Sequence, residues 1–466
     1  MDSSGWVMAR KEHSCFGSRD FSGETRRGKN EDPFVVLSPG ITIRICLFIL
    51  GLNPFTYSPA LRCYTFRWCS LGAVYSLFTL AWLSALIVTS FIGLVSLLSA
   101  SSYHTTGVSD LQMMGVAIVF GCLFNAWLNV LITLSRARQY CDLYNGWLEL
   151  ISSTSLRSNK GIKLASHIYA AFLLVFVTSV LAMGLAGPPD LLLAIVDLLT
   201  KVLLLIDTDR IAQDDTATAK TLRVIVMAIV AQVYLIYKSA IFMFVSDCQK
   251  VYNTLASWRI QLSYSLDVIW GRREPGCGLQ GADSDCCCKD DLATLIQTYQ
   301  QLTQLIHQTE KLYSATLQSF YATHIVTLCL ELSFLAWGIG VGGNYFHEET
   351  VWQTLVILQT FIVFFLVSLK ASRVAEEGLQ CVALLRRSLP YYSTEKDKYH
   401  FEQLHMILTA SPVCISGGQY FSITRAFIVT VVGVVLSYFM IVLQVKLPSV
   451  HQQRAALLAT NWSLDQ

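Results

Sequence analysis

The fold is decided by a run of 28 residues near the start of the chain without a single charged side chain, LGAVYSLFTLAWLSALIVTSFIGLVSLL at positions 71–98. A helix of about 20 apolar residues is long enough to cross the hydrocarbon core of a bilayer. Of the 466 residues, 53% are hydrophobic and only 14% are charged, roughly half the charged fraction of a soluble domain. We therefore expect a polytopic membrane protein. The same composition argues against a disordered chain, a coiled coil or a nucleic-acid-binding protein.

Six further apolar stretches are long enough to span, and together they predict an all-α membrane protein with seven transmembrane helices: Leu71–Leu98, Met113–Leu134, His167–Gly187, Val224–Ser246, Phe320–Val341, Val351–Leu369 and Ala426–Val445. Residues 191–206 are also apolar but short, and they hold Asp197 and Lys201 four residues apart. That spacing suits an ion pair on one helix face. We predict an interfacial helix there rather than a span.

The positions of the basic residues predict the orientation. With the N-terminus inside, 27 of the 34 Lys and Arg residues fall in cytoplasmic parts, as the positive-inside rule requires. No signal peptide precedes the first span. The predicted orientation is the reverse of a G-protein-coupled receptor, and an odd number of spans argues against an inverted-repeat transporter.

The predicted spans divide the chain into seven consecutive units. They are a cytoplasmic N-terminal region (1–70), spans one to four (71–250), a cytoplasmic loop with a helical extension (251–319), spans five and six (320–371), a cytoplasmic helical anchor (372–420), the last span (421–447) and an extracellular tail (448–466). Apolar residues in 292–312 recur mostly three and four apart, which predicts an amphipathic helix leading into span five. A second such stretch, 374–389, continues span six inward.

The last predicted span carries a polar stripe. Thr430, Ser437 and Gln444 recur every seven residues along an otherwise apolar helix, so they lie close to one face. In one interpretation the hydroxyl groups bond back to their own helix and Gln444 bonds a neighbour. In the other, identical helices around a symmetry axis form a pore and the stripe faces it, because a Gln exposed to lipid is unfavourable.

Sequence around this stripe resembles the C-terminal signature of insect gustatory receptors, which is Thr-Tyr, five hydrophobic residues and Gln-Phe. The chain has Ser437, Tyr438, Gln444 and Val445 at the signature positions, and the lead-in 421–425 (Phe-Ser-Ile-Thr-Arg) is most similar to the sugar-receptor branch. The resemblance implies a tetrameric ligand-gated cation channel of the plasma membrane, homomeric or mixed with other gustatory receptors and gated by a small-molecule tastant. It also implies that Thr430, Ser437, Tyr438, Gln444 and Val445 line the pore or form its gate, where Val445 is smaller than the usual Phe.

Polar and aromatic residues inside the other spans are ligand-pocket candidates, because ionisable and amide groups are unfavourable in lipid. They are Asn125, Trp127, His324, Glu331, Trp337 and Gln353, with Asn129 and Gln359 as further members. Aromatic rings beside carboxylate and amide groups suit a polyhydroxylated ligand. Lys238 is expected to extend toward the inner membrane surface instead.

Other sites and other classes of protein have weaker support. Cys286, Cys287 and Cys288 are palmitoylation candidates and lack the spaced partners of a zinc site. Asn461 lies in the single glycosylation sequon. No catalytic motif is present, and we expect no metal, no cofactor and no enzyme activity. The alternatives are an odorant-type channel for an apolar ligand or carbon dioxide, a membrane-embedded enzyme, and a transporter.

Overall fold

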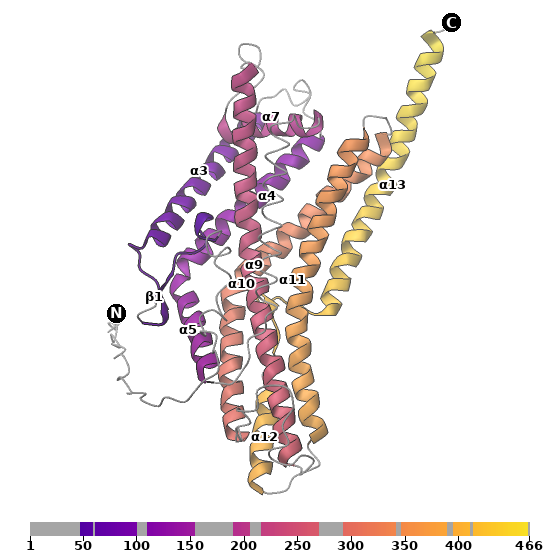
Figure 1. Ribbon diagram of the computed structural model, residues 1–466. Helices are drawn as coiled ribbons and strands as arrows, with labels where there is room; N and C mark the ends of the chain where they lie inside the picture. Colours follow the sequence, from indigo (N-terminus) through magenta and orange to yellow (C-terminus); the bar gives the residue numbers. More distant parts are fainter. Residues whose placement is uncertain are drawn as a thin grey trace, which may run out of the picture.

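The computed structural model describes residues 47–58, 61–99, 110–153, 190–205, 216–269, 292–341, 346–388, 395–410 and 413–464. This part of the chain is almost entirely helical (Figure 1). Its helices are α3 (Leu71–Ser99), α4 (Asp110–Ser135), α5 (Ala137–Ser153), α7 (Asp190–Leu204), α9 (Thr216–Ile269), α10 (Leu292–Val341), α11 (Phe346–Ser388), α12 (Glu395–Ala410) and α13 (Arg425–Leu464).

Six of the described helices are long and apolar enough to cross a membrane. They are α3, α4, α9, α10, α11 and α13, and each overlaps one of the predicted spans. The predicted third span, His167–Gly187, lies outside the described residues. The expectation of an all-α membrane protein is therefore confirmed.

Three helices are much longer than a bilayer is thick. α9, α10 and α11 have 54, 50 and 43 residues, and 50 residues of helix measure about 75 Å at roughly 1.5 Å per residue. The amphipathic stretches 292–312 and 374–389 are continuous with the spans in α10 and α11. The lower ends of α10 and α11 pack with α12 (Figure 1). Trp258 of α9 is fully buried and donates from Nε1 to the Leu295 carbonyl of α10 at 3.0 Å.

The short helix α7 occupies the stretch predicted to be interfacial. It runs across the other end of the bundle, close to α3 and α4 (Figure 1). Both oxygens of Asp197 accept hydrogen bonds from Arg223 of α9, at 2.8 Å from Nε and 3.0 Å from the terminal nitrogen. The four-residue spacing along α7 predicted Lys201 as the partner of Asp197. Spacing within one helix cannot reveal Arg223, which lies on another helix.

A small antiparallel hairpin precedes each of two spanning helices, α3 and α13. Strands β1 (Thr56–Ser58) and β2 (Cys63–Thr65) precede α3. Asn145 of α5 holds them, accepting from the Tyr64 amide at 2.7 Å and donating to its carbonyl at 3.0 Å.

Strands β3 (Ser416–Gly417) and β4 (Phe421–Ser422) precede α13. Their turn requires positive φ at Gly418 and Gln419, the geometry of a tight hairpin turn. Thr424 then caps α13 through the Phe427 amide at 3.3 Å. Residues 421–424, which we placed in the last-span unit, are therefore strand and cap, and the helix itself continues to Leu464 through the predicted tail.

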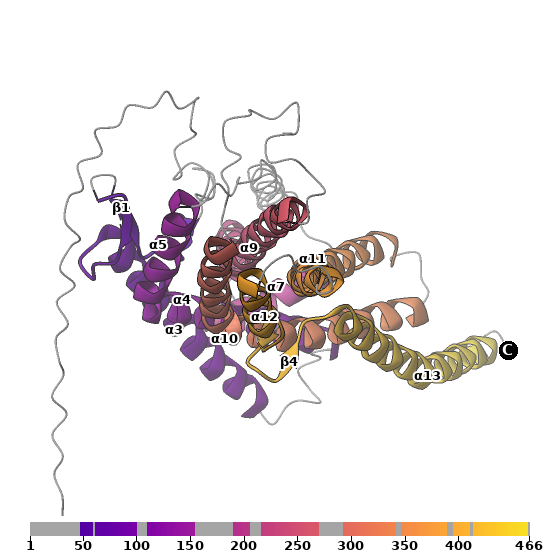
Figure 2. The same ribbon diagram turned by 90° about the horizontal axis from the view of Figure 1, so that it is seen from below.

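Figure 2, the view from below, shows α13 at the edge of the bundle, away from α3, α4 and α5. Its buried residues Ile428, Val431 and Val435 follow helical spacing and face the neighbours α10 and α11. The opposite face of α13 is not covered by the described part of the chain.

Candidate functional site

A buried lysine lies inside the bundle formed by α9, α10 and α11. Lys238 of α9 is only 5% exposed. Its Nζ is 3.3 Å from Nε2 of His324 and lies over the rings of Tyr234 and Tyr237, 5.1 and 4.8 Å from their centroids. The expectation that Lys238 extends toward the membrane surface is wrong. Its ammonium group is held in place by two aromatic faces and an imidazole, which lower the free energy of burying the charge.

His324 of α10 bridges two side chains of α9. Its Nδ1 contacts the Tyr237 hydroxyl group and its Nε2 contacts Lys238. Because a charged lysine can only donate, Nε2 must accept. A neutral imidazole with its proton on Nδ1, donating to the Tyr237 oxygen, satisfies both contacts.

Glu331 lies two helical turns further along α10 and is 6% exposed. Its Oε1 accepts a hydrogen bond from Thr360 Oγ1 of α11 at 3.1 Å. Its Oε2 is buried and has no hydrogen-bond partner among the residues that the structure describes. An unpartnered buried carboxylate oxygen is unfavourable, so the hydrogen bonding of Glu331 is incomplete within the described residues.

The neighbouring residue on α11, Gln359, donates to the Tyr234 hydroxyl group. Two sets of polar contacts thus join helices α9, α10 and α11. One set connects Tyr237, His324, Lys238, Tyr234 and Gln359, and the other is the Glu331–Thr360 pair. Because Gln359 and Thr360 are consecutive on α11, we call the two sets together the α9–α11 polar cluster. Its members are Tyr234, Tyr237, Lys238, His324, Glu331, Gln359 and Thr360. Sequence reasoning found His324, Glu331 and Gln359 and missed the tyrosines and Thr360, because such residues are common in spans.

The two asparagines of α4 form a separate link to α10. Asn125 donates to Ser319 Oγ at 2.8 Å and to Thr323 Oγ1 at 3.0 Å, and it accepts from Asn129 at 2.8 Å. Thr323 is next to His324 in the sequence. Asn125 therefore fixes the helix that carries His324 and Glu331.

The remaining ligand candidates are not brought into the cluster by described contacts. Trp127 donates from Nε1 to Ser84 Oγ of α3 at 2.9 Å, so it is committed to the α3–α4 contact. The side chains of Trp337 and Gln353 lie outside the described residues, and their predicted role stays a prediction. The same holds for Cys286, Cys287 and Cys288 and for the side chain of Asn461.

The polar stripe of α13 lies on the face that this chain leaves uncovered. Thr430 donates to the Ala426 carbonyl at 3.0 Å and Ser437 to the Gly433 carbonyl at 2.8 Å. Thr430, Ser437 and Gln444 are all exposed, and a Cβ at Gly433 would meet no atom within 4 Å. The two hydroxyl groups are thus hydrogen-bonded within their own helix, whereas the face as a whole is not covered by the described part of the chain.

The signature residues beside the stripe differ in environment. Tyr438 is 38% exposed and its hydroxyl group lies 3.2 Å from Ser333 Oγ of α10. Val445 is 66% exposed. Tyr438 therefore connects α13 to the helix that carries Glu331, while the end of the stripe is free of contacts that would bury it.

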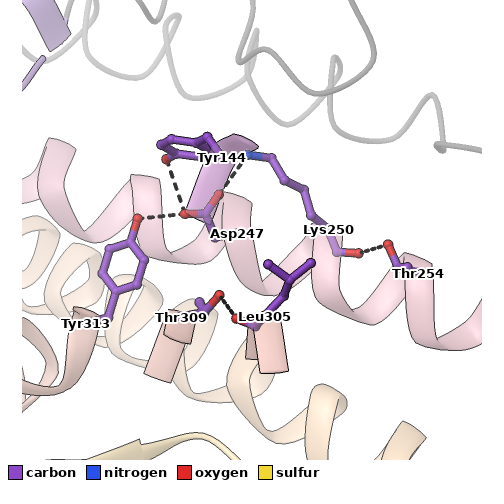
Figure 3. A network of polar contacts seen from close by, with 7 residues as sticks. All are labelled: Tyr144, Asp247, Lys250, Thr254, Leu305, Thr309 and Tyr313. Carbon is purple, nitrogen blue, oxygen red and sulfur yellow. Dashed lines mark hydrogen bonds and ion pairs between the residues drawn. The ribbon is translucent and has the colours of Figure 1, made fainter. Parts of the chain in front are cut away.

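A second charged cluster lies nine residues further along α9 (Figure 3). Asp247 is 2% exposed and accepts from Lys250 Nζ at 2.7 Å, from the Tyr313 hydroxyl group at 2.7 Å and from the Tyr144 hydroxyl group at 3.3 Å. Burial, and then the negative charge of Asp247, raise the pKa of Tyr144 well above its ordinary value, so the phenol keeps the proton that it donates. This Asp247 cluster joins α5, α9 and α10.

The part of the chain that the structure describes holds no group of three His, Cys, Asp or Glu residues able to bind a metal ion. The α9–α11 polar cluster contains hydrogen-bonding and aromatic groups of the kind that bind small molecules.

Comparison with known proteins gives the family. The family model of the 7tm chemosensory receptors matches residues 41–448. Comparison with curated protein sequences gave no match.

Among solved structures, the chain is similar to the insect olfactory receptor OR5 from Machilis hrabei, with TM-score 0.59 and 18% identity. It is also similar to the same receptor in complex with eugenol, with TM-score 0.58 and 17% identity. Both alignments cover 89% of this chain and 100% of the receptor. Because the family model matches most of the chain, the protein belongs to the 7tm chemosensory receptor family.

Proposed function

We propose that this chain is a gustatory receptor of the plasma membrane that acts as a ligand-gated, non-selective cation channel for a sugar or a related small polar molecule. The observation that carries the proposal is the unpartnered, buried Oε2 of Glu331 within the α9–α11 polar cluster. Machilis hrabei OR5, which has the same fold, was solved with the small molecule eugenol, and this supports a small-molecule ligand here.

The chemistry of the cluster favours a ligand with several hydroxyl groups. Glu331 can accept from one hydroxyl group, and the amide of Gln359 and the ammonium of Lys238 can each re-form a hydrogen bond to a ligand oxygen. The rings of Tyr234 and Tyr237 offer apolar faces against which a sugar ring can stack. A ligand that satisfies Glu331 gains the stabilisation that the empty site lacks.

The uncovered face of α13 supports the channel. A Gln in contact with lipid is unfavourable, whereas a ring of Gln side chains around an axis contacts water and other Gln side chains. We propose that four chains, identical or from related receptors, place Thr430, Ser437 and Gln444 along the ion path. Leu443 and Val445 then narrow the closed pore and exclude water from it.

Ligand binding and the pore are connected by α10 in this proposal. Glu331 and Ser333 lie on the same helix, and Ser333 contacts Tyr438 of α13. A shift of α10 on ligand binding would therefore displace α13 next to Ser437.

An odorant-type receptor for a more apolar ligand is the second candidate. Its specific support is the likeness to an olfactory receptor and the aromatic surroundings of His324, whose ring lies 3.9 Å from that of Phe320. An apolar ligand would leave Glu331 Oε2 unpartnered, which is why we prefer the polar one.

Currents from voltage-clamped cells expressing the chain test the channel and its ligand together. We expect a cation current with sugars and little with aromatic odorants or carbon dioxide. Gln444→Ala should alter leak, conductance or selectivity, and Gln444→Cys should react with thiol reagents from outside, faster with agonist. If both variants conduct as the parent does and the cysteine never reacts, the stripe is a packing feature and the pore lies elsewhere.

The proposed orientation has its own test. Epitope tags at the two ends should be detected differently on intact cells, with the C-terminal tag accessible and the N-terminal tag accessible only after permeabilisation. An N-terminal tag detected on intact cells would overturn the orientation.

A further inference from the structure

The β1–β2 hairpin lies at the edge of the bundle, outside the α9–α11 polar cluster. It leads into α3, and Figure 1 shows it at the lower end of that helix. The view from below places it at the opposite edge of the bundle from α13 (Figure 2). If other chains assemble against the uncovered face of α13, as proposed above, the hairpin faces away from them.

Apolar side chains of α3 face lipid from the first residue of the helix. Leu71 is 74% exposed, and the exposed Val74 and Phe78 follow it on the same face at helical spacing. The 29 residues of α3 measure about 43 Å along the helix, and the helix is inclined to α9 in Figure 1. An inclined helix of this length fits a hydrocarbon core of about 30 Å. The residues just before Leu71 therefore lie at the level of the lipid headgroups.

Two arginines and a tryptophan lie at or near this level. Arg67 and Trp68 directly precede α3, and Arg62 is in the turn of the hairpin. Trp68 is 52% exposed, and Trp prefers the boundary between lipid and water. Both arginines are exposed. Within the described part of the chain, neither guanidinium group takes part in an ion pair or a hydrogen bond, so both charges are available to an anionic partner.

The backbone at Arg62 gives a second observation. Its φ is +49°, in the left-handed region where a residue with a side chain is less stable than glycine. The turn geometry alone would favour glycine at this position. Arg62 is therefore present at a cost to the stability of the hairpin, and strain of this kind points to a function of the side chain.

We propose that the hairpin binds anionic phospholipids at the membrane surface, with the guanidinium groups of Arg62 and Arg67 on headgroup phosphates and Trp68 in the headgroup layer. A guanidinium group can donate two parallel N–H bonds to a phosphate, and anionic lipids attract each basic residue near the surface. In the proposed orientation the hairpin is on the cytoplasmic side, where the anionic lipids are concentrated.

Binding would fix the hairpin against the bundle. Asn145 of α5 bonds both the amide and the carbonyl of Tyr64 in β2. The ring centroids of Tyr64 and Tyr144 are 5.4 Å apart, and Tyr144 donates to Asp247. A hairpin held at the lipid surface is thus in contact with the Asp247 cluster. This inference goes beyond the proposed channel function and does not depend on it.

The test uses the purified full-length receptor in phosphatidylcholine nanodiscs with a trace of photoreactive phosphatidylserine or, in a parallel sample, photoreactive phosphatidylcholine. A nanodisc presents the same lipids on both sides, so the result does not depend on orientation or on channel activity. Labelling by a trace lipid is proportional to its association constant. We expect phosphatidylserine to label residues 61–71 about ten-fold more strongly than phosphatidylcholine, or more. Equal labelling by the two lipids would overturn the proposal.

Arg62→Gly and Arg67→Gln each remove one charge, and each should lower the ratio of phosphatidylserine to phosphatidylcholine labelling about five-fold. Because glycine suits the positive φ at position 62, Arg62→Gly should unfold in phosphatidylcholine at the temperature of the parent or above it. Its lower ratio would then reflect the lost charge and not a folding defect. An unchanged ratio in either variant contradicts binding through this pair.

The combined variant Arg386→Gln and Arg387→Gln is the matched control for charge. Both residues are exposed in the last turn of α11, about 25 Å of helix beyond Leu369 and therefore well beyond a Debye length of about 8 Å. The labelling ratio should stay as in the parent, and an equal fall would overturn the site. Excess inorganic phosphate at constant ionic strength should also leave the ratio unchanged. A loss of labelling with phosphate would assign the arginines to a soluble anion and overturn lipid binding.

Discussion

Helix α9 carries buried charged side chains at two places, at Lys238 and at the Asp247–Lys250 pair, and the surroundings of the two places differ. Around Asp247, each carboxylate oxygen accepts from a donor, and Lys250 balances the charge. Around Lys238, aromatic rings and a neutral imidazole surround the ammonium group, and the nearby Glu331 keeps one oxygen without a described partner.

The difference separates a structural cluster from a binding one. Buried polar networks stabilise a unique packing when every group is satisfied, and an unsatisfied member raises the free energy of the folded state. The Asp247 cluster joins three helices and has no vacant position for a ligand at its carboxylate. In the α9–α11 polar cluster, by contrast, Glu331 Oε2 has no hydrogen-bond partner among the described residues.

The largest effect is expected for Asp247→Ala. Removing the carboxylate leaves Lys250 buried without its counter-charge and leaves two tyrosine hydroxyl groups without an acceptor, a loss of about 3 to 5 kcal/mol in the free energy of unfolding. Thermal unfolding of the purified receptor and its yield at the cell surface measure this. Glu149→Ala, at an exposed position of α5, is the control. Normal stability of Asp247→Ala would show that the cluster is not structural.

Tyr313→Phe should have the next largest effect on stability. Its hydroxyl group donates to Asp247 at 2.7 Å, and a hydrogen bond to a charged group contributes about 1.5 to 3 kcal/mol. We expect a lower unfolding temperature with the dose response of the surviving receptors unchanged. A shift in ligand sensitivity at normal stability would place Tyr313 in the binding pathway and blur the distinction between the clusters.

Glu331→Gln should change the ligand sensitivity and leave the stability unchanged. The amide keeps the volume and can still accept from Thr360, so stability should hold, whereas the charged acceptor for the ligand is lost. We expect a shift of at least ten-fold in the agonist dose response, which corresponds to about 1.4 kcal/mol. Glu402→Gln, at an exposed position of α12, is the matched control. An unchanged dose response would make Glu331 a structural residue.

The described spans could be predicted from sequence because a bilayer requires long apolar runs, and such runs are visible without any knowledge of partners. The continuity of α10 and α11 with their amphipathic extensions was predictable for a similar reason, since both follow helical spacing. Contacts between side chains on different helices were not predictable from the sequence. Asp247 binds tyrosines 66 and 103 residues away, and no local pattern reports such a pairing.

The candidate site was only partly predictable. Glu331 and His324 were found because ionisable groups are unusual in spans. The predicted orientation of Lys238 was wrong because extension toward the surface is the default for a lone lysine. The groups that hold it are Tyr234, four residues earlier on α9, the adjacent Tyr237, and the imidazole of His324 on α10. The unpartnered oxygen of Glu331 can be recognised only once the neighbours of that atom are known.

The smallest effect is expected for Tyr144→Phe. Its hydroxyl group is 3.3 Å from Asp247, longer than the Tyr313 bond, and Asp247 keeps Lys250 and Tyr313 when it is lost. The phenylalanine ring preserves the aromatic face under Lys250. We therefore expect a cost of about 0.5 to 1 kcal/mol, measured as the change in thermal unfolding beside Tyr313→Phe. In the double variant the loss of stability should exceed the sum of the two single losses. The carboxylate then keeps Lys250 as its one described partner, and the network fails as a unit. Simple additivity would mean that the two tyrosines contribute independently, and that the Asp247 cluster is a set of separate contacts rather than one structural element.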